Sequence, residues 1–191
     1  MITRESLLSL EAYARERNAF RARVIAHKKR RTVALGAHVV LLFEDELTIR
    51  YQVQEMLRIE RIFEQAGIQG ELDAYNPLVP DGGNWKATML IEYPDEAERK
   101  RMLGVLKGIE RSVWVGAEGC ARVAAIADED LERENEEKTA SVHFLRFEID
   151  PAMRAALRSS AALAVGVDHP HYRASVRVDA EVRSALLADL R

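Results

Sequence analysis

The chain has 191 residues, of which 48% are hydrophobic and 31% charged, and its formal net charge is −3. This length suffices for one well-buried core, while the slightly acidic charge argues against nucleic-acid binding, which needs a basic surface. Cys120 is the single cysteine, so an intrachain disulfide is excluded, as suits a reducing cytoplasm. No apolar run has the length of a signal peptide or a membrane span. The composition therefore predicts a cytoplasmic protein without membrane or nucleic-acid partners.

The first third of the chain is predicted to form a long helix and a β-hairpin. Apolar residues at helical spacing mark a helix that starts at a cap on Thr3 and ends in the basic run 27–31. The apolar run Val39–Phe43 predicts a strand that is covered on both faces. Alternation of apolar and polar residues over 47–54 predicts a second strand with one polar face, which completes the hairpin.

A second helix and a long loop are expected next. The helix covers about residues 54–66, and Gly67 is placed to end it. Two prolines and three glycines then predict a loop over 70–84. That loop is the natural boundary between two lobes, residues 1–70 and 85–191, of one α+β domain.

Strands alternate with helices in the second half. Alternating or apolar runs predict strands at 87–93, 113–117, 122–127, 142–149 and 163–167. Helices are expected after the capping residues Asp95, Asp150 and Asp179. The acidic segment 128–137 is predicted to be an exposed helix or loop. The fold class is therefore α+β: a long N-terminal helix and a hairpin–helix unit packed on a mixed, largely antiparallel sheet with helices mainly on one face.

Polar residues gather where the predicted hairpin passes into the second helix. Arg50 and Arg58 can clamp a carboxylate or phosphate through bidentate hydrogen bonds. Gln54 beside them, with Tyr75 and Asn76 in the following loop, completes a candidate ligand-binding site. The alternative is that Arg58 pairs with a neighbouring glutamate along the helix, which contributes only ~0.2–0.5 kcal/mol.

Three side chains are candidates for acid–base chemistry. His143 falls on the apolar face of its predicted strand, where a histidine acts either as a catalytic group or as a core residue with both nitrogens hydrogen-bonded. Glu55 and Glu60 are the carboxylate candidates. The chain has no nucleophile elbow, phosphate-binding loop, dinucleotide fingerprint or zinc-protease motif, so the sequence leaves any cofactor unknown.

A second histidine group raises the alternative of a metal site. Asp168, His169 and His171 stand close enough in an extended segment to reach one metal ion, and His143 could supply a further ligand. Plain turn chemistry explains Asp168 and Pro170 equally well.

Four segments of the chain together carry a family resemblance: LLFEDELTIRYQVQEMLRIERIF, ELDAYNPLVPDGGNWKATMLIEYP, IADEDLERENEEKTASVHFLRFEI and GVDHPHY. With them, the chain resembles the uncharacterised bacterial domain-of-unknown-function family 3501 over essentially its whole length. The resemblance implies a stand-alone cytosolic protein whose gene lies near those of rubrerythrin and iron–sulfur oxidoreductases. It assigns no catalytic residue.

Three functions stay open. The resemblance and the absence of catalytic motifs favour an accessory or interaction protein of a redox system, with rubrerythrin or an iron–sulfur oxidoreductase as partner. The polar residues favour an enzyme or sensor for a small anionic ligand, with its site near Arg50, Arg58 and His143. The histidines allow a metalloprotein. The sequence is also compatible with a homo-oligomer.

Overall fold

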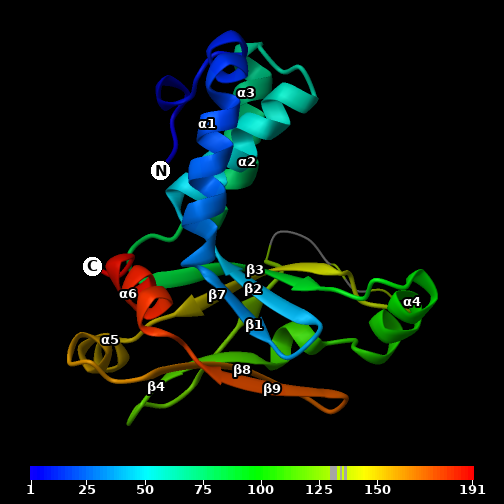
Figure 1. Ribbon diagram of the computed structural model, residues 1–191, viewed down its shortest axis with the longest axis vertical. Coiled ribbons are helices and arrows are strands. Elements are labelled where there is room, and N and C mark those ends of the chain that lie inside the picture. The colour runs from blue at the N-terminus through cyan, green and yellow to red at the C-terminus, as the bar shows by residue number, and fades with distance from the viewer. Residues whose placement is uncertain (130–132, 134, 136) are drawn as a thin grey trace.

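The computed structural model describes residues 1–129, 133, 135 and 137–191. Helices form an arm that stands on a sandwich of two β-sheets (Figure 1), so the α+β class is confirmed. The arm contains η1 (Arg4–Ser6), α1 (Leu10–Lys29), α2 (Glu46–Ile59), α3 (Gln65–Tyr75) and η2 (Asn76–Leu78), where η denotes a short 3₁₀ helix. None of the helices in the described ranges is both long and apolar enough to cross a membrane.

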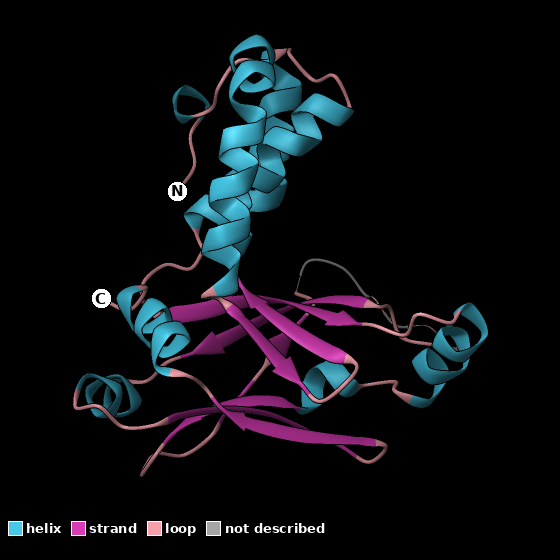
Figure 2. Ribbon diagram, in the orientation of Figure 1, coloured by secondary structure: helices cyan, strands magenta, loops and turns pink. Residues whose placement is uncertain are grey.

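The described strands divide between two sheets in which every pairing is antiparallel. Sheet A has, in spatial order, β1 (Thr32–Leu35), β2 (Val39–Phe43), β3 (Asn84–Ile91), β7 (Val142–Glu148) and β6 (Ile126–Ala127). Sheet B has β5 (Val123–Ala124), β4 (Val113–Ala117), β8 (Leu163–His169) and β9 (Tyr172–Arg177). Further helices are α4 (Glu96–Val105), η3 (Ile109–Ser112), α5 (Pro151–Arg158) and α6 (Ala180–Ala188). Figure 2 shows α4 at one end of the sandwich and α5 and α6 at the other.

Two separate hydrophobic cores hold the molecule together. The larger one fills the space between the sheets, where Trp85 also donates its indole N–H to the carbonyl of Leu186 at 2.9 Å and so attaches α6. The smaller one lies inside the arm and consists of Ile2, Ile49, Val53, Leu57 and Leu72. The division into lobes 1–70 and 85–191 stays a prediction. The hairpin β1–β2 is part of sheet A, since β2 pairs with β3.

The strand predicted over 47–54 is wrong, because these residues belong to α2. Asp45 caps this helix: its Oδ1 accepts from the backbone N–H of Thr48 at 3.0 Å, and its own N–H donates to Thr48 Oγ1 at 2.9 Å. Ile49 and Val53 face the arm core at a spacing of four residues. Alternate apolar residues satisfied the strand pattern over this short window, whereas the capping pair was the signal for a helix.

The helix predicted over 54–66 is likewise two helices. The first ends at Ile59, and Arg61 takes a left-handed conformation with φ of 54°. The N–H of Ile62 then bonds to the carbonyl of Leu57 at 2.9 Å, as in a helix-ending turn that glycine usually makes. Gly67 lies inside α3, where a Cβ would stand 2.6 Å from Ile62 Cγ2, so its role is close packing.

The capping residues of the second half are confirmed. Asp95, Asp150 and Asp179 each accept a hydrogen bond from a backbone N–H in the first turn of the helix that follows. At the N-terminus, however, Ser9 caps the long helix, and Thr3 caps η1. The strand predicted over 122–127 is divided between the sheets, because β5 pairs with β4 and β6 pairs with β7. Much of the acidic segment 128–137 lies outside the described residues.

Candidate functional site

The predicted ligand-binding residues lie on the arm, and most of them bind other parts of the chain. Arg50 contacts the Glu46 carboxylate and the Ser6 carbonyl. Gln54 is buried and pairs with the backbone of Leu8, accepting from its N–H at 2.7 Å and donating to its carbonyl at 3.3 Å. Asn76 pairs in the same way with Ile2, at 2.9 and 3.0 Å. Tyr75 is half-buried beside them, and burial raises its pKa. These amides hold the N-terminal segment against the arm.

Glu55 is the centre of an ion-pair cluster between α1 and α2. Its carboxylate accepts two hydrogen bonds from Arg17, both at 2.8 Å, and one from the hydroxyl of Tyr13 at 2.7 Å. Arg58 donates to it at 3.2 Å. Arg17, above all, lowers the pKa of Glu55 to about 2. Glu60, at the C-terminal cap of α2, is exposed. Arg58 is thus attached to its own helix neighbour, as the alternative interpretation predicted.

His143 is fully buried in the sandwich, on the inner face of β7. Its Nδ1 lies 2.6 Å from Asp128 Oδ2, and its Nε2 lies 3.0 Å from Thr139 Oγ1 and 2.9 Å from the Ala140 carbonyl. Both nitrogens therefore have partners within the protein. The pocket that Arg50 helps to line does not include His143.

Two metal candidates of β8, Asp168 and His169, have partners within the protein. Asp168 pairs with Arg122 at 3.1 Å. His169 Nε2 lies 3.0 Å from the Lys107 carbonyl, and its Nδ1 accepts from the backbone N–H of His171 at 3.2 Å. In the part of the chain that the structure describes, no three His, Cys, Asp or Glu side chains are grouped as a metal site requires. Metal binding by His143, Asp168, His169 and His171 stays a prediction.

A cleft of about 550 Å³ lies on the outer face of sheet A. We call it the sheet A cleft. Its floor comes from β3 and β7, and one wall is the segment that leads from the arm into β3. Apolar and charged side chains both line it: Pro77, Leu78, Asp81, Asn84, Lys86, Glu129, Phe144, Leu145, Arg146 and Glu148. A partly apolar cleft with a few convergent charged groups is the usual form of a small-molecule site.

Two cations stand directly opposite each other on the floor of this cleft. Lys86 on β3 and Arg146 on β7 are cross-strand partners. Arg146 donates two hydrogen bonds to Glu129, both at 2.7 Å, and also contacts Glu148. These hydrogen bonds lower the pKa of Glu129. The Lys86 ammonium donates to the carbonyl of Pro77, which fixes it against the cleft wall.

The environment of Lys86 changes its acidity. Burial, and next the positive charge of Arg146, lower the pKa of Lys86 below its ordinary value. Sequence reasoning missed both cations, although period-two alternation does place Arg146 and Glu148 on the strand face opposite His143. No local signal reveals that Lys86, sixty residues earlier, pairs with Arg146, because the register between β3 and β7 joins distant segments.

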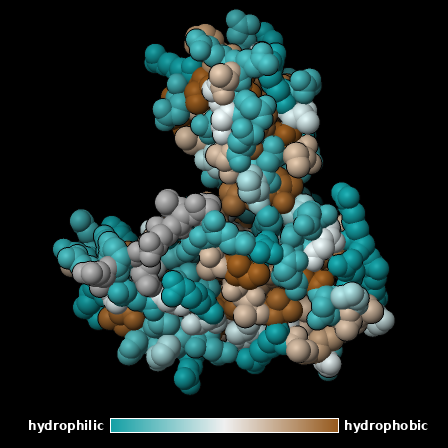
Figure 3. All heavy atoms as spheres, turned by 180° about the vertical axis from the view of Figure 1, so that it is seen from behind, coloured by the Kyte–Doolittle hydropathy of each residue, from teal (hydrophilic) through white to brown (hydrophobic). Residues whose placement is uncertain are grey.

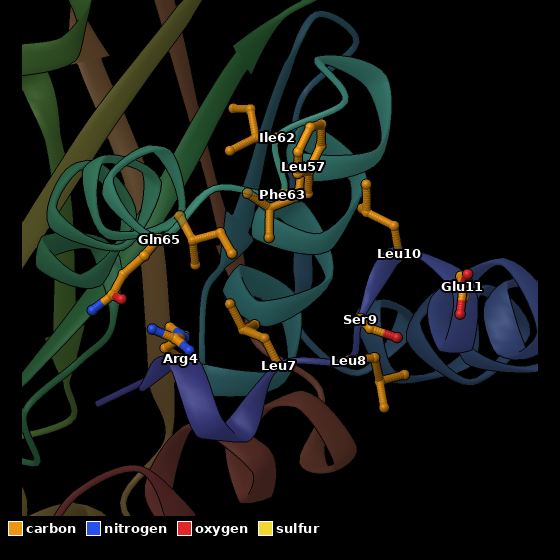
Figure 4. Close-up of a pocket in the computed structure, with 11 residues that line it drawn as sticks. Arg4, Leu7, Leu8, Ser9, Leu10, Glu11, Leu57, Ile62, Phe63 and Gln65 are labelled. Carbon is orange, nitrogen blue, oxygen red and sulfur yellow. The ribbon is translucent and has the colours of Figure 1, made fainter.

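An apolar pocket of about 440 Å³ opens near the outer end of the arm. Figure 4 shows Leu7, Leu57, Ile62 and Phe63 pointing into one space, with Arg4 and Gln65 at its side. Phe63 and Ile59 are 73% and 56% exposed, which is unusual for large apolar side chains. Hydrophobic residues also show between hydrophilic ones on the face of the arm in Figure 3.

A family profile and a solved structure each match essentially the whole chain. The profile of the family described as "Protein of unknown function (DUF3501)" matches residues 1–190. The chain belongs to this family. It is also similar to a solved structure, that of a novel protein of unknown function from Burkholderia pseudomallei K96243. The two share 57% sequence identity and a TM-score of 0.95, over 100% of this chain and 99% of the other. No curated protein matches the chain significantly.

Proposed function

We propose that the protein binds a small anionic ligand, a carboxylate, in the sheet A cleft. The observation that carries the proposal is the pair of Lys86 and Arg146, which stand directly opposite each other on the cleft floor. Like charges at such positions destabilise a sheet, and here the carboxylates of Glu129 and Glu148 offset the repulsion, a role that a ligand carboxylate can take over. Leu78 and Phe144 provide apolar walls for the rest of a ligand. The site thus lies on sheet A, away from the predicted Arg50 and Arg58.

The internal partners of Arg146 leave room for such a ligand. Glu129 is half-exposed, at 52%, and Arg146 is 26% exposed. An ion pair this close to solvent contributes only about 0–1 kcal/mol. A ligand carboxylate can therefore replace Glu129 in the bidentate fork of Arg146 at little cost, while Lys86 contributes the second positive charge.

Calorimetry with lactate, succinate and inorganic phosphate tests this function. We expect a carboxylate to bind, and Arg146→Ala to weaken its binding tenfold or more, as loss of a charge-assisted hydrogen bond of about 1.5–3 kcal/mol implies. Arg101→Ala is the matched control, since Arg101 is exposed on α4 and should leave binding unchanged. Equal affinity of the Arg146 variant and the unchanged protein, or no binding of any carboxylate, would contradict the proposal.

A second candidate function is that of an interaction protein, which the exposed Phe63 in the arm pocket favours. The family resemblance implies a redox partner, either rubrerythrin or an iron–sulfur oxidoreductase. We expect the purified partner to bind through an apolar side chain that enters the pocket, and Phe63→Asp to raise the Kd tenfold or more. Ile25→Asp serves as the control, since Ile25 is an exposed apolar residue on α1 that does not line the arm pocket. Absence of binding to both purified redox proteins removes this candidate.

A further inference from the structure

We propose that Lys86 is a nucleophilic amine which forms a Schiff base with the carbonyl group of a 2-oxo acid, while Arg146 holds the acid's carboxylate. This inference rests on the proposed function and names its ligand class. A 2-oxo acid carries its carbonyl and its carboxylate on adjacent carbon atoms. The two protein groups that would receive them are likewise adjacent, since Lys86 and Arg146 are direct cross-strand partners.

The geometry of the cleft suits this pairing. Opposite residues of antiparallel strands have Cβ atoms about 4.5–5.5 Å apart, so two long side chains from such positions can reach neighbouring atoms of one small molecule. Lys86 is half-buried, and its contact with the Pro77 carbonyl keeps the ammonium at the cleft wall. Leu78 and Phe144 provide an apolar surface for the ligand's side chain.

The charge around Lys86 favours the neutral amine that attacks a carbonyl. Burial and the Arg146 charge lower the pKa of Lys86, so a larger fraction is unprotonated near neutral pH than for an ordinary lysine. The other charges that face Lys86 are the carboxylates of Asp81, Glu129 and Glu148, and these oppose the effect. A ligand carboxylate that replaces Glu129 on Arg146 would leave this balance of charges largely unchanged.

The chemical step requires no oxidant and no further reactant. The lone pair of Lys86 Nζ forms a bond to the carbonyl carbon, the π electrons of the C=O bond move to the oxygen, and a first proton passes from the nitrogen to that oxygen to give a neutral carbinolamine. A proton then passes from the nitrogen to the hydroxyl oxygen, which leaves as water when the C–N double bond forms. Glu148 lies beside Arg146 in the cleft and is placed to relay that proton. One ketone and one amine thus yield one imine and one water molecule.

Reductive trapping tests the inference on the full chain. The protein is incubated with pyruvate and cyanoborohydride, which reduces an imine to a stable secondary amine, and the modified lysine is located by peptide mass spectrometry. We expect modification at Lys86 in preference to exposed lysines such as Lys100, because the lowered pKa of Lys86 leaves more of its amine neutral near neutral pH. Lys86→Arg keeps the charge and should abolish the adduct. Lys100→Met should leave the adduct at Lys86 unchanged.

Two comparisons separate the role of Arg146 from general lysine reactivity. Arg146→Ala should lower the ratio of pyruvate trapping to trapping of propanal, which has no carboxylate, tenfold or more, since each lost charge-assisted bond is worth about 1.5–3 kcal/mol. Adducts spread evenly over the lysines, or an unmodified Lys86 in protein that binds lactate by calorimetry, would overturn the Schiff base and leave the proposed function standing. If neither pyruvate nor lactate binds, both fail.

Discussion

Replacing Arg31 by methionine is expected to lower the free energy of unfolding by about 3–5 kcal/mol, because it leaves buried charges without their partner. Arg31 is 2% exposed. It donates to the carbonyls of Phe43 and Glu44, pairs with Asp189 of α6, and lies 3.4 Å from Asp45 at the start of α2. One guanidinium thus joins the base of the arm to both β2 and the C-terminal helix.

Removal of Arg31 takes a cationic partner from two carboxylates, those of Asp45 and Asp189. Burial raises the pKa of Asp45, but the Arg31 charge, the Thr48 N–H and His27 together outweigh this effect, and the pKa lies below its ordinary value. Burial raises the pKa of Asp189 even with Arg31 in contact. Urea unfolding followed by tryptophan fluorescence measures the loss. The matched control is Arg30→Met, since Arg30 is exposed and adjacent, and its effect should stay within about 0.5 kcal/mol. Equal effects of the two substitutions would refute the role of Arg31.

Replacing Glu55 by glutamine is expected to destabilise the arm by about 2–3 kcal/mol, since it removes the charge that Arg17, Tyr13 and Arg58 share. Both tryptophans, Trp85 and Trp114, lie in the sandwich. Tryptophan fluorescence therefore reports on the sandwich, whereas far-UV circular dichroism reports largely on the arm, which holds the three longest helices of the described chain. The midpoint of the dichroism signal should shift more than that of the fluorescence.

The effect of Glu55 depends on pH. Its pKa falls from 4.5 to about 2 on folding, chiefly through Arg17. The unfolded chain therefore binds the proton more readily, and the contribution of Glu55 is fully present above pH 4.5 and is lost as the pH falls toward 2. Unchanged protein and Glu55→Gln should thus approach equal stability in acid. Glu60→Gln changes an exposed residue at the C-terminal cap of the same helix, α2. It should show neither the loss of stability nor this pH dependence.

Much of the fold follows from local patterns in the sequence. Asp95, Asp150 and Asp179 cap their helices as predicted, since a side-chain oxygen that satisfies a free N–H acts within three residues. The apolar run of β2 and the alternation around His143 also hold, because side-chain direction in a strand has a fixed period of two. The strand predicted over 47–54 was wrong, because apolar residues in a window so short fit the helical period as well as the strand period.

The candidate sites depended far more on tertiary structure. Arg50, Gln54 and Asn76 have the chemistry of ligand-binding residues, but the N-terminal segment folds back onto them and takes up their hydrogen-bonding groups. His143 has the chemistry of a catalytic histidine, yet Asp128 and Ala140 occupy its nitrogens. The partners of Arg50, Gln54 and Asn76 come from a segment more than forty residues away, so no local pattern predicts them.

The sequence by itself determined the α+β class, the helix caps, the inward and outward faces of β3 and β7, and the family to which the chain belongs. Each of these depends on residues near one another in the chain, or on similarity along its whole length. Only the tertiary structure decided that Lys86 stands opposite Arg146, that the arm and sandwich have separate cores, and that Arg31 joins them. Strand register and buried ion pairs arise from long-range packing, which no local period encodes.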